Sequence, residues 1–377
     1  MTPALKVLIV GGYGTFGGRL AQLLANEQRL TLIIAGRSQA KAAAFCRQLR
    51  SKAAVVPCAF DRDGDLRAQV AKIAPDIVVD ATGPFQSYGA EPYRLVQVAL
   101  ALGISYLDLA DGTAFVKGVA QFDAAARERG LFVLSGVSSF PVLTAAVVRV
   151  LARDMPRVEK VIGGIAPSPY ASVGLNVIRA IAGYAGRPVK IGRDGTIGYA
   201  LIDSKRYTIA PPGHRPLRPI RFSLVDVPDL QLLPELWPSL ESVWMGAGPL
   251  PAIWHRALSL LAWAVRLKLL PSLLPFAGLM QSAMHYLSFG EHRGGMFVSA
   301  EGIGSDGRRL ERSWHLLAEG EDGPFIPSMA AQAIILNCLG GKPPQPGARA
   351  AVAELELADY DALFASRRIS TGFRQSH

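Results

Sequence analysis

The chain has 377 residues, of which 50% are hydrophobic and 19% are charged, and its formal net charge is +10. This length exceeds one ordinary domain and this composition excludes a disordered chain, so we expect two lobes with extensive cores. The positive charge does not predict a nucleic-acid partner, because the basic residues are scattered and no basic stripe with interleaved aromatic side chains occurs.

Residues 5–135 alternate short apolar runs with amphipathic helical stretches. Strands are predicted at Leu5–Val10, Leu30–Ala35, Ala54–Pro57, Ile77–Asp80, Ser105–Leu107 and Leu131–Leu134, and helices at Phe16–Asn26, Ala40–Leu49, Leu66–Ala74, Tyr93–Leu102 and Phe122–Arg129. Strands that are apolar throughout are buried on both faces, and helices between them indicate a parallel sheet. The predicted fold class is α/β, with an N-terminal Rossmann-type doubly wound sheet over residues 1–144.

A different pattern follows Phe140-Pro141. Longer, alternating segments predict strands at Lys160–Ile165, Thr196–Ile202, Pro219–Val227, Met296–Gly302 and Arg312–Ala318. This alternation is typical of an antiparallel sheet with one covered face, so we expect a second α+β lobe over residues 145–320 for substrate binding or dimerisation. Residues 321–377 should supply a helix, Phe325–Leu339, that returns to the first lobe, and a tail with a short helix around Asp359–Ala365.

An unusual apolar segment spans residues 249–289. Ile253–Leu270 has helical spacing, and the apolar run between its two arginines is far shorter than the ~20 residues that a transmembrane helix needs. Its polar side chains share one narrow face: His255, Arg256, Ser259 and Arg266. Two interpretations stay open, a helix buried between lobes or in a dimer interface, and an in-plane helix at a membrane surface that makes the protein peripheral to the membrane through residues 253–270.

A glycine-rich loop joins the first strand to the first helix. Its residues, all candidates for cofactor binding, are Gly11, Gly12, Tyr13, Gly14, Thr15, Phe16 and Gly17. Placed between a buried strand and an amphipathic helix, this spacing predicts a dinucleotide site in which the pyrophosphate meets the helix N-terminus. The tight turn can rest on either Gly11 or Gly12, so the register of the motif stays open.

The end of the second strand predicts which dinucleotide is bound. An NAD site usually places a carboxylate there, whereas an NADP site places arginine near the 2′-phosphate. The chain has Gly36, Arg37 and Ser38 at this position and no carboxylate. A guanidinium can form charge-assisted hydrogen bonds to the phosphate, and Lys41 can add a second positive charge. NADP is therefore the expected cofactor, ahead of NAD.

The loop after the fourth predicted strand should lie beside the middle of the cofactor, because ligands bind beyond the carboxyl ends of parallel strands. Its candidate binding residues are Thr82, Gly83, Pro84 and Phe85. We interpret Asp80, at the end of that strand, as a carboxylate that caps a helix or fixes the loop, and not as a catalytic group.

No catalytic acid or base can be assigned from the residues alone. Asp108, Asp111 and His292 are weak candidates, and both aspartates can equally cap a helix that begins near Thr113. Ser138 and Ser139 can line the nicotinamide pocket or cap a helix over Pro141–Leu151. The sequence has no HExxH, no GxSxG and no paired cysteines, so we expect neither a metal nor hydrolase chemistry. With no signal-peptide pattern, the cytoplasm is the expected location.

Four segments together resemble the saccharopine dehydrogenase-like NADP-binding family. They are Gly-Gly-Tyr-Gly-Thr-Phe-Gly-Gly, Ala-Gly-Arg-Ser, Ala-Thr-Gly-Pro-Phe-Gln-Ser-Tyr-Gly and Gly-Ile-Ser-Tyr-Leu-Asp-Leu-Ala-Asp-Gly. The resemblance implies a Rossmann domain, NADP and an oxidoreductase that transfers hydride to or from a small-molecule C–N, C=C or C=O group. We expect a homo-oligomer. The alternative is a non-catalytic NADP-binding scaffold or membrane-peripheral protein, because no catalytic constellation accompanies the amphipathic segment.

Overall fold

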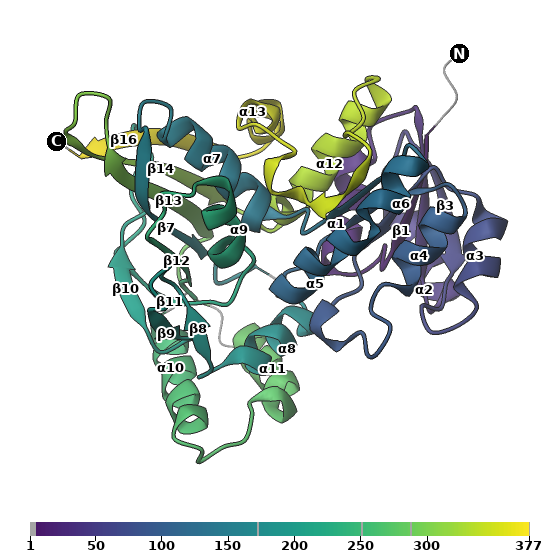
Figure 1. Ribbon diagram of the computed structural model, residues 1–377. Helices are drawn as coiled ribbons and strands as arrows, with labels where there is room; N and C mark the ends of the chain where they lie inside the picture. The colour runs from purple at the N-terminus through teal and green to yellow at the C-terminus, as the bar shows by residue number, and fades with distance from the viewer. Residues whose placement is uncertain (1–4, 172, 250–251, 287–288, 377) are drawn as a thin grey trace. The chain divides into compact units, whose positions relative to one another are not determined.

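The computed structural model describes residues 5–171, 173–249, 252–286 and 289–376 (Figure 1). The chain divides into two compact units, and each unit is formed by two separate segments of the chain. Unit 1 comprises Met1–Val142 and Phe325–Leu355, and unit 2 comprises Leu143–Pro324 and Glu356–His377. Each unit is built on one seven-stranded sheet.

The sheet of unit 1 is parallel throughout and has the strand order β15-β6-β5-β4-β1-β2-β3. Its strands are β1 (Leu5–Val10), β2 (Leu30–Gly36), β3 (Ala54–Ala59), β4 (Ile77–Asp80), β5 (Ser105–Asp108), β6 (Phe132–Ser135) and β15 (Gly347–Ala350). Strands β1, β4, β5 and β6 are almost entirely buried. The chain order reverses between β1 and β4, which makes the carboxyl ends of these two strands the topological switch point.

Helices connect the strands of this sheet. They are α1 (Thr15–Leu24), α2 (Gln39–Gln48), α3 (Leu66–Ile73), α4 (Arg94–Ala101), α5 (Thr113–Gly118), α6 (Asp123–Glu128) and α12 (Ile326–Leu339). Although α12 is distant in sequence, it packs beside α1 (Figure 1). The Ser328 hydroxyl donates to the Phe16 carbonyl at 3.1 Å, and the Gln332 amide donates to the Leu23 carbonyl at 3.0 Å. Unit 1 is therefore completed by a segment that follows most of unit 2 in the chain.

The sheet of unit 2 has the order β10-β11-β12-β7-β13-β14-β16. Its strands are β7 (Arg157–Ala166), β10 (Ser204–Tyr207), β11 (Ile220–Leu224), β12 (Ser242–Ala247), β13 (Arg293–Ile303), β14 (Arg309–Glu319) and β16 (Ile369–Ser376). Every pairing is antiparallel except that of β7 with β12, which is parallel. A separate antiparallel pair consists of β8 (Pro188–Lys190) and β9 (Ile197–Tyr199).

The helices of unit 2 are α7 (Thr144–Leu151), α8 (Leu175–Tyr184), α9 (Asp229–Leu236), α10 (Ala252–Arg266), α11 (Ala277–Tyr286) and α13 (Ala358–Ala365). The short 3-10 helix η4 (Leu274–Phe276) precedes α11, and both contact α8. Among the described helices, none is both long enough and apolar enough to cross a lipid bilayer.

The predicted fold class is confirmed: a parallel doubly wound sheet is joined to a second, mainly antiparallel sheet. Two details of the prediction are wrong. The strand expected over Thr196–Ile202 is reduced to β9, because the chain turns at Leu201, which has a φ of 63°. The helix expected over Pro141–Leu151 begins as a π-helical turn, Ser139–Leu143, and α7 starts only at Thr144.

Candidate dinucleotide-binding site

The candidate site lies at the switch point of the unit 1 sheet, where the loops after β1 and β4 touch. Gly11 follows β1 and Ala81 follows β4, and the Ala81 N–H donates to the Val10 carbonyl at 2.9 Å. A Cβ atom added to Gly11 would lie 2.9 Å from the Ala81 carbonyl oxygen and 3.1 Å from the Thr82 methyl carbon. The two loops therefore leave room only for glycine at this point of contact.

The conformation of the glycine loop assigns the tight turn to Gly11. This residue has a φ of +80°, in the left-handed region that favours glycine, and its carbonyl accepts the Gly14 N–H at 2.8 Å. A Cβ at Gly17 would lie only 2.3 Å from that same carbonyl oxygen, so Gly17 permits α1 to approach the turn. The register that the sequence left open is thus resolved in favour of Gly11 as the turn residue, with Gly12 packed against β2.

The N-terminus of α1 points its unpaired backbone donors toward this loop. Gly14 is the N-cap residue and has an extended conformation with no side-chain cap, and α1 has no acidic residue in its first turn. The first N–H groups of a helix have no acceptor within the helix, and its dipole favours an anion there. The residues present therefore fit a pyrophosphate group, since the loop is open at Gly14 and offers backbone donors without a carboxylate.

Tyr13 connects the glycine loop to the end of β2. Its ring lies over Gly36, where an added Cβ would be 2.5 Å from the ring, and its hydroxyl accepts the Ser38 N–H at 3.1 Å. Ser38 in turn caps α2 by accepting the Lys41 N–H at 3.3 Å. One aromatic side chain thereby fixes the position of the segment that carries Arg37.

Positive charge is concentrated at this end of β2. Arg37 and Lys41 are exposed, and Arg37 has no hydrogen-bond or ion-pair partner within the described parts of the chain. No aspartate or glutamate occurs between Glu27 and Asp61. An anion placed against Ser38 would therefore meet two cations and the N-terminus of α2.

A buried ionic network fixes the loop after β4. Asp80 is completely buried, and its carboxylate accepts hydrogen bonds from the Thr82 N–H at 3.1 Å and the Thr82 hydroxyl at 2.5 Å. Arg62 forms an ion pair with Asp80 at 3.2 Å, and its guanidinium lies 3.3 Å above the ring of Tyr88. The Tyr88 hydroxyl lies 2.5 Å from the Thr82 hydroxyl. Asp80 is thus a loop-fixing residue, as expected, whereas Arg62 and its role were not anticipated.

Phe85 supports the same loop from beneath. Its ring is 5% exposed and packs against Tyr88 and Phe115, with ring centroids 4.9 Å and 5.0 Å away. Thr82, Gly83 and Pro84 are partly exposed. Of the four loop residues proposed to contact a cofactor, these three are accessible, and Phe85 lies behind them.

Asp108 and Asp111 occupy very different environments at the end of β5. Asp108 is completely buried, and its Oδ1 accepts hydrogen bonds from Ala110 N–H, Gly136 N–H and the Ser135 hydroxyl, each at 2.9 Å. Burial raises the pKa of Asp108 to about 7. Asp111 is exposed and accepts a hydrogen bond from the Gln86 amide at 3.0 Å. The prediction that either caps the following helix is wrong, because α5 has Gly112 as its N-cap residue and no side-chain cap.

The remaining candidates are His292 in unit 2 and two serines that follow β6. His292 lies in unit 2, is exposed, and stacks on Tyr170 with ring centroids 3.6 Å apart. Ser138 and Ser139 follow β6 in unit 1, and neither caps α7, whose N-cap residue is Leu143. Ser139 is buried and Ser138 is partly exposed, so only Ser138 is accessible at this edge.

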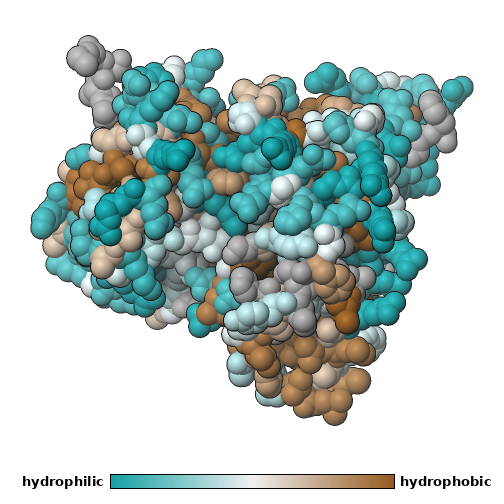
Figure 2. Space-filling model, turned by 180° about the vertical axis from the view of Figure 1, so that it is seen from behind, coloured by the Kyte–Doolittle hydropathy of each residue, from teal (hydrophilic) through white to brown (hydrophobic). Residues whose placement is uncertain are grey.

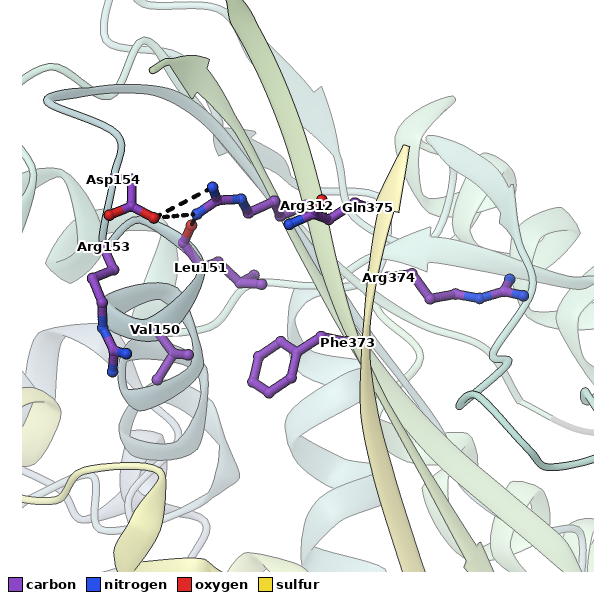
Figure 3. Close-up of a pocket in the computed structure, with 8 residues that line it drawn as sticks. All are labelled: Val150, Leu151, Arg153, Asp154, Arg312, Phe373, Arg374 and Gln375. Carbon is purple, nitrogen blue, oxygen red and sulfur yellow. Dashed lines mark hydrogen bonds and ion pairs between the residues drawn. The ribbon is translucent and has the colours of Figure 1, made fainter. Parts of the chain in front are cut away.

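A pocket of about 240 Å³ lies in unit 2, between α7 and the edge strand β16 (Figure 3). Arg312 crosses it and is held by Asp154 at 3.4 Å and by the Leu151 carbonyl at 3.2 Å. Phe373 points toward α7, whereas Arg374 points away from the pocket on the other face of β16 (Figure 3). Its volume is below the range of about 300–1,000 Å³ typical of ligand pockets, so it does not fit a dinucleotide.

The fold and the glycine loop define a class of protein. A parallel sheet with a glycine turn at its switch point is the architecture of dinucleotide-binding folds. Residues 7–134 match the family model of the saccharopine dehydrogenase NADP binding domain. No curated protein sequence matches the chain.

Solved structures with this fold include apo saccharopine dehydrogenase (L-Glu forming) from Saccharomyces cerevisiae. It is 14% identical, has a TM-score of 0.64, and the match covers 99% of this chain and 100% of that one. GenD2 from gentamicin A biosynthesis, in complex with NAD, is 14% identical with a TM-score of 0.44, covering 92% and 90% of the two chains. Biliverdin reductase from Synechocystis sp. PCC 6803, with biliverdin and NADP+, is 15% identical with a TM-score of 0.38, covering 95% of each.

Only the yeast enzyme bears on the fold of the whole chain, because the other two TM-scores are below 0.5. The chain therefore combines a saccharopine dehydrogenase NADP binding domain with the overall fold of that enzyme. This combination supports an oxidoreductase that uses a nicotinamide dinucleotide.

Proposed function

We propose that the protein is an NADP-dependent oxidoreductase that reduces or oxidises a C–N, C=C or C=O group of a small molecule. The observation that carries the proposal is the cationic end of β2, where Arg37 stands without a partner in the described part of the chain and the strand ends without a carboxylate of its own. The cofactor supplies the hydride chemistry, so the residues of the chain bind and orient it.

The proposed binding roles follow the contacts in unit 1. The backbone of Gly11–Gly17 receives the pyrophosphate, and Arg37, Ser38 and Lys41 receive the 2′-phosphate. The accessible residues of the β4 loop, held in place by Asp80, face the middle of the cofactor. Among the catalytic candidates, Asp111 is the exposed carboxylate at this edge, whereas Asp108 is sealed inside and acts by positioning the backbone after β6.

Cofactor preference gives the direct test. Replacing Arg37→Ala should weaken NADPH binding by roughly 1.5–3 kcal/mol, which is about 10- to 100-fold, and leave NADH binding nearly unchanged. Arg47→Ala is the matched control, because Arg47 is exposed in the last turn of α2, at the opposite end of that helix from Ser38. Titration calorimetry with both cofactors measures the effect. Equal weakening of both cofactors by Arg37→Ala contradicts the assignment of the 2′-phosphate site.

Turnover is tested separately from binding. NADPH oxidation should be followed with imine or saccharopine-type substrates and with enoyl or carbonyl substrates, using wild type and Asp111→Asn. Substrate-dependent oxidation that Asp111→Asn reduces supports the proposed chemistry. Tight NADPH binding without turnover on any of these substrates favours the non-catalytic scaffold instead, an alternative motivated by the burial of both Asp80 and Asp108.

A further inference from the structure

Three polar side chains of the helix α10 face the protein, whereas Arg256 and the large apolar side chains Leu260 and Trp263 are exposed to solvent. On the inner side, the Ser223 hydroxyl lies 2.7 Å from His255 Nε2, and the Ser259 hydroxyl donates to the Leu201 carbonyl at 2.8 Å. Two turns further, the Arg266 guanidinium lies 3.2 Å over the ring of Tyr199. An amphipathic helix of a water-soluble surface has the opposite orientation.

The outer side of α10 continues into an exposed apolar surface. The six most exposed large hydrophobic side chains in the described parts of the chain are each at least 61% exposed, and all lie between residues 253 and 286. They define what we call the apolar tip: Ile253, Leu260, Leu267, Leu269, Leu279 and Tyr286. Figure 2 shows hydrophobic residues gathered at this end of unit 2, over α10 and α11. Single exposed leucines are ordinary, but a cluster of this kind marks an interaction surface.

Exposed basic side chains accompany the apolar tip. No aspartate or glutamate occurs between Glu241 and Glu291, and none occurs between Glu159 and Asp194, the stretch that contains α8. Arg256 and Lys268 are exposed within and just after α10. The segment that packs on α10 carries one carboxylate, Asp203, which accepts a hydrogen bond from the Tyr199 N–H. An apolar surface with exposed cations beside it complements a surface that combines acyl chains with anionic headgroups.

We infer that the apolar tip docks the protein on the surface of a membrane that contains anionic phospholipids. The 15-residue α10 is too short to span a bilayer and would lie in the plane of the interface. Trp263 and Tyr286, both exposed, are of the types enriched where acyl chains meet headgroups. A second copy of the chain is a poorer occupant, because a two-fold contact would bring Arg256 and Lys268 of both copies together.

The test uses the full-length protein and co-sedimentation with vesicles of phosphatidylcholine alone or mixed with phosphatidylglycerol. Wild type should bind the mixed vesicles and lose binding as salt rises. The double variant Leu260→Glu with Leu267→Glu should bind at least tenfold more weakly. Val56→Glu, which alters an exposed apolar side chain of unit 1, should bind like wild type. NADPH binding, retained by all variants, reports that the protein is folded and is independent of vesicle binding.

A second arm removes charge without touching the apolar side chains. Arg256→Gln with Lys268→Gln should weaken binding to mixed vesicles by about fivefold per charge. Quenching of tryptophan fluorescence by brominated lipids should fall in Trp263→Phe. The inference is overturned if wild type does not bind mixed vesicles, or if both multiple variants bind them as wild type does. It is also overturned if light scattering shows a dimer that the leucine variant dissociates while no vesicle binding occurs.

Discussion

Asp80 and Asp108 are register partners on the neighbouring parallel strands β4 and β5, and both carboxyl groups are completely buried. The carboxylate of Asp80 forms an ion pair with Arg62 at 3.2 Å. In the described part of the chain, Asp108 forms no ion pair and accepts hydrogen bonds from three neutral donors. Burial therefore raises the pKa of Asp108 to about 7, and the negative charge of Asp80 adds to this effect. Two identical side chains at equivalent strand positions thus differ in their response to pH.

The pH dependence of stability should reveal Asp108. Its pKa is higher in the folded protein than in the unfolded chain, so the folded state retains this proton over a range in which the unfolded chain has lost it. The contribution of protonated Asp108 to the stability of the folded state is complete below about pH 4 and is lost as the pH rises to about 7. Asp108→Asn keeps the three hydrogen bonds to Oδ1 and cannot ionise.

We therefore expect Asp108→Asn to become more stable relative to wild type by roughly 2–3 kcal/mol between pH 5 and pH 8. Urea unfolding at both pH values measures this difference. Burial also raises the pKa of Asp229 in unit 2 to about 7. Asp229 is present in both proteins, so its effect on stability cancels in the difference between them. A constant difference between the two pH values would show that Asp108 is not the titrating group.

Removing Arg62 should destabilise unit 1. Arg62→Met leaves the buried carboxylate of Asp80 without its cation and should lower the free energy of unfolding by about 3 kcal/mol. Adding Asp80→Asn should restore most of that loss, because the unpaired charge is then absent. In the control Arg127→Met, the ion pair with Asp123 is exposed, and the loss should stay below about 1 kcal/mol. An additive double variant in urea unfolding would refute the coupling between Arg62 and Asp80.

Glycine is required at position 17 by contact rather than by backbone conformation. Gly17→Ala would place a methyl group 2.3 Å from the Gly11 carbonyl oxygen, so we expect a stability loss of roughly 1–3 kcal/mol and weaker cofactor binding. Gly183→Ala is the matched helical control, because no atom lies within 4 Å of the added methyl group. Alanine favours helix by up to about 1 kcal/mol, so this variant should be neutral or stabilised in thermal unfolding. Equal behaviour of the two variants would contradict the close contact at Gly17.

The Ser223–His255 hydrogen bond should anchor α10 to β11. Both side chains are buried, so Ser223→Ala leaves an imidazole nitrogen without a partner and should cost about 1–3 kcal/mol. Adding His255→Phe should recover part of the loss, because the unsatisfied polar group is removed. Ser366→Ala, at an exposed hydroxyl that donates to the Leu363 carbonyl, should change stability by less than about 0.5 kcal/mol. Calorimetry that finds no difference between Ser223→Ala and Ser366→Ala would exclude this anchoring role.

Sequence patterns predicted the parallel sheet because its strands are short, apolar and separated by helices, and they predicted the phosphate turn because glycine is required there for local reasons. They did not predict Arg62, since its partner Asp80 lies 18 residues away on another element and Arg62 itself stands in a polar loop. The edge strand β16 was also missed. Its sequence, Ile-Ser-Thr-Gly-Phe-Arg-Gln-Ser, is polar and has no apolar alternation, so only the pairing with β14 identifies it.

The same limit applies to α10. The sequence predicted one narrow polar face with His255, Arg256, Ser259 and Arg266, and three of these side chains do share the face that meets the protein. Arg256 is exposed instead, and a helical pattern does not specify which face meets the protein. That choice depends on Ser223, Leu201 and Tyr199, which supply partners for the polar side chains and lie on other elements. Asp108 illustrates a related difficulty, because a carboxylate before a helix predicts a cap, whereas here the chain turns it inward toward Gly136.

The return of α12 and β15 to unit 1 has a consequence for biosynthesis. Ribosomes deliver residues 1–142 first, but the seventh strand of that sheet and the helix beside α1 emerge only after residue 324. Until then, β6 has an open edge where β15 will pair, and the surface of α1 that Ser328 and Gln332 contact remains uncovered. Unit 1 therefore cannot complete its sheet until most of unit 2 has been translated. A gene fragment that stops at Val142 encodes an incomplete, aggregation-prone sheet.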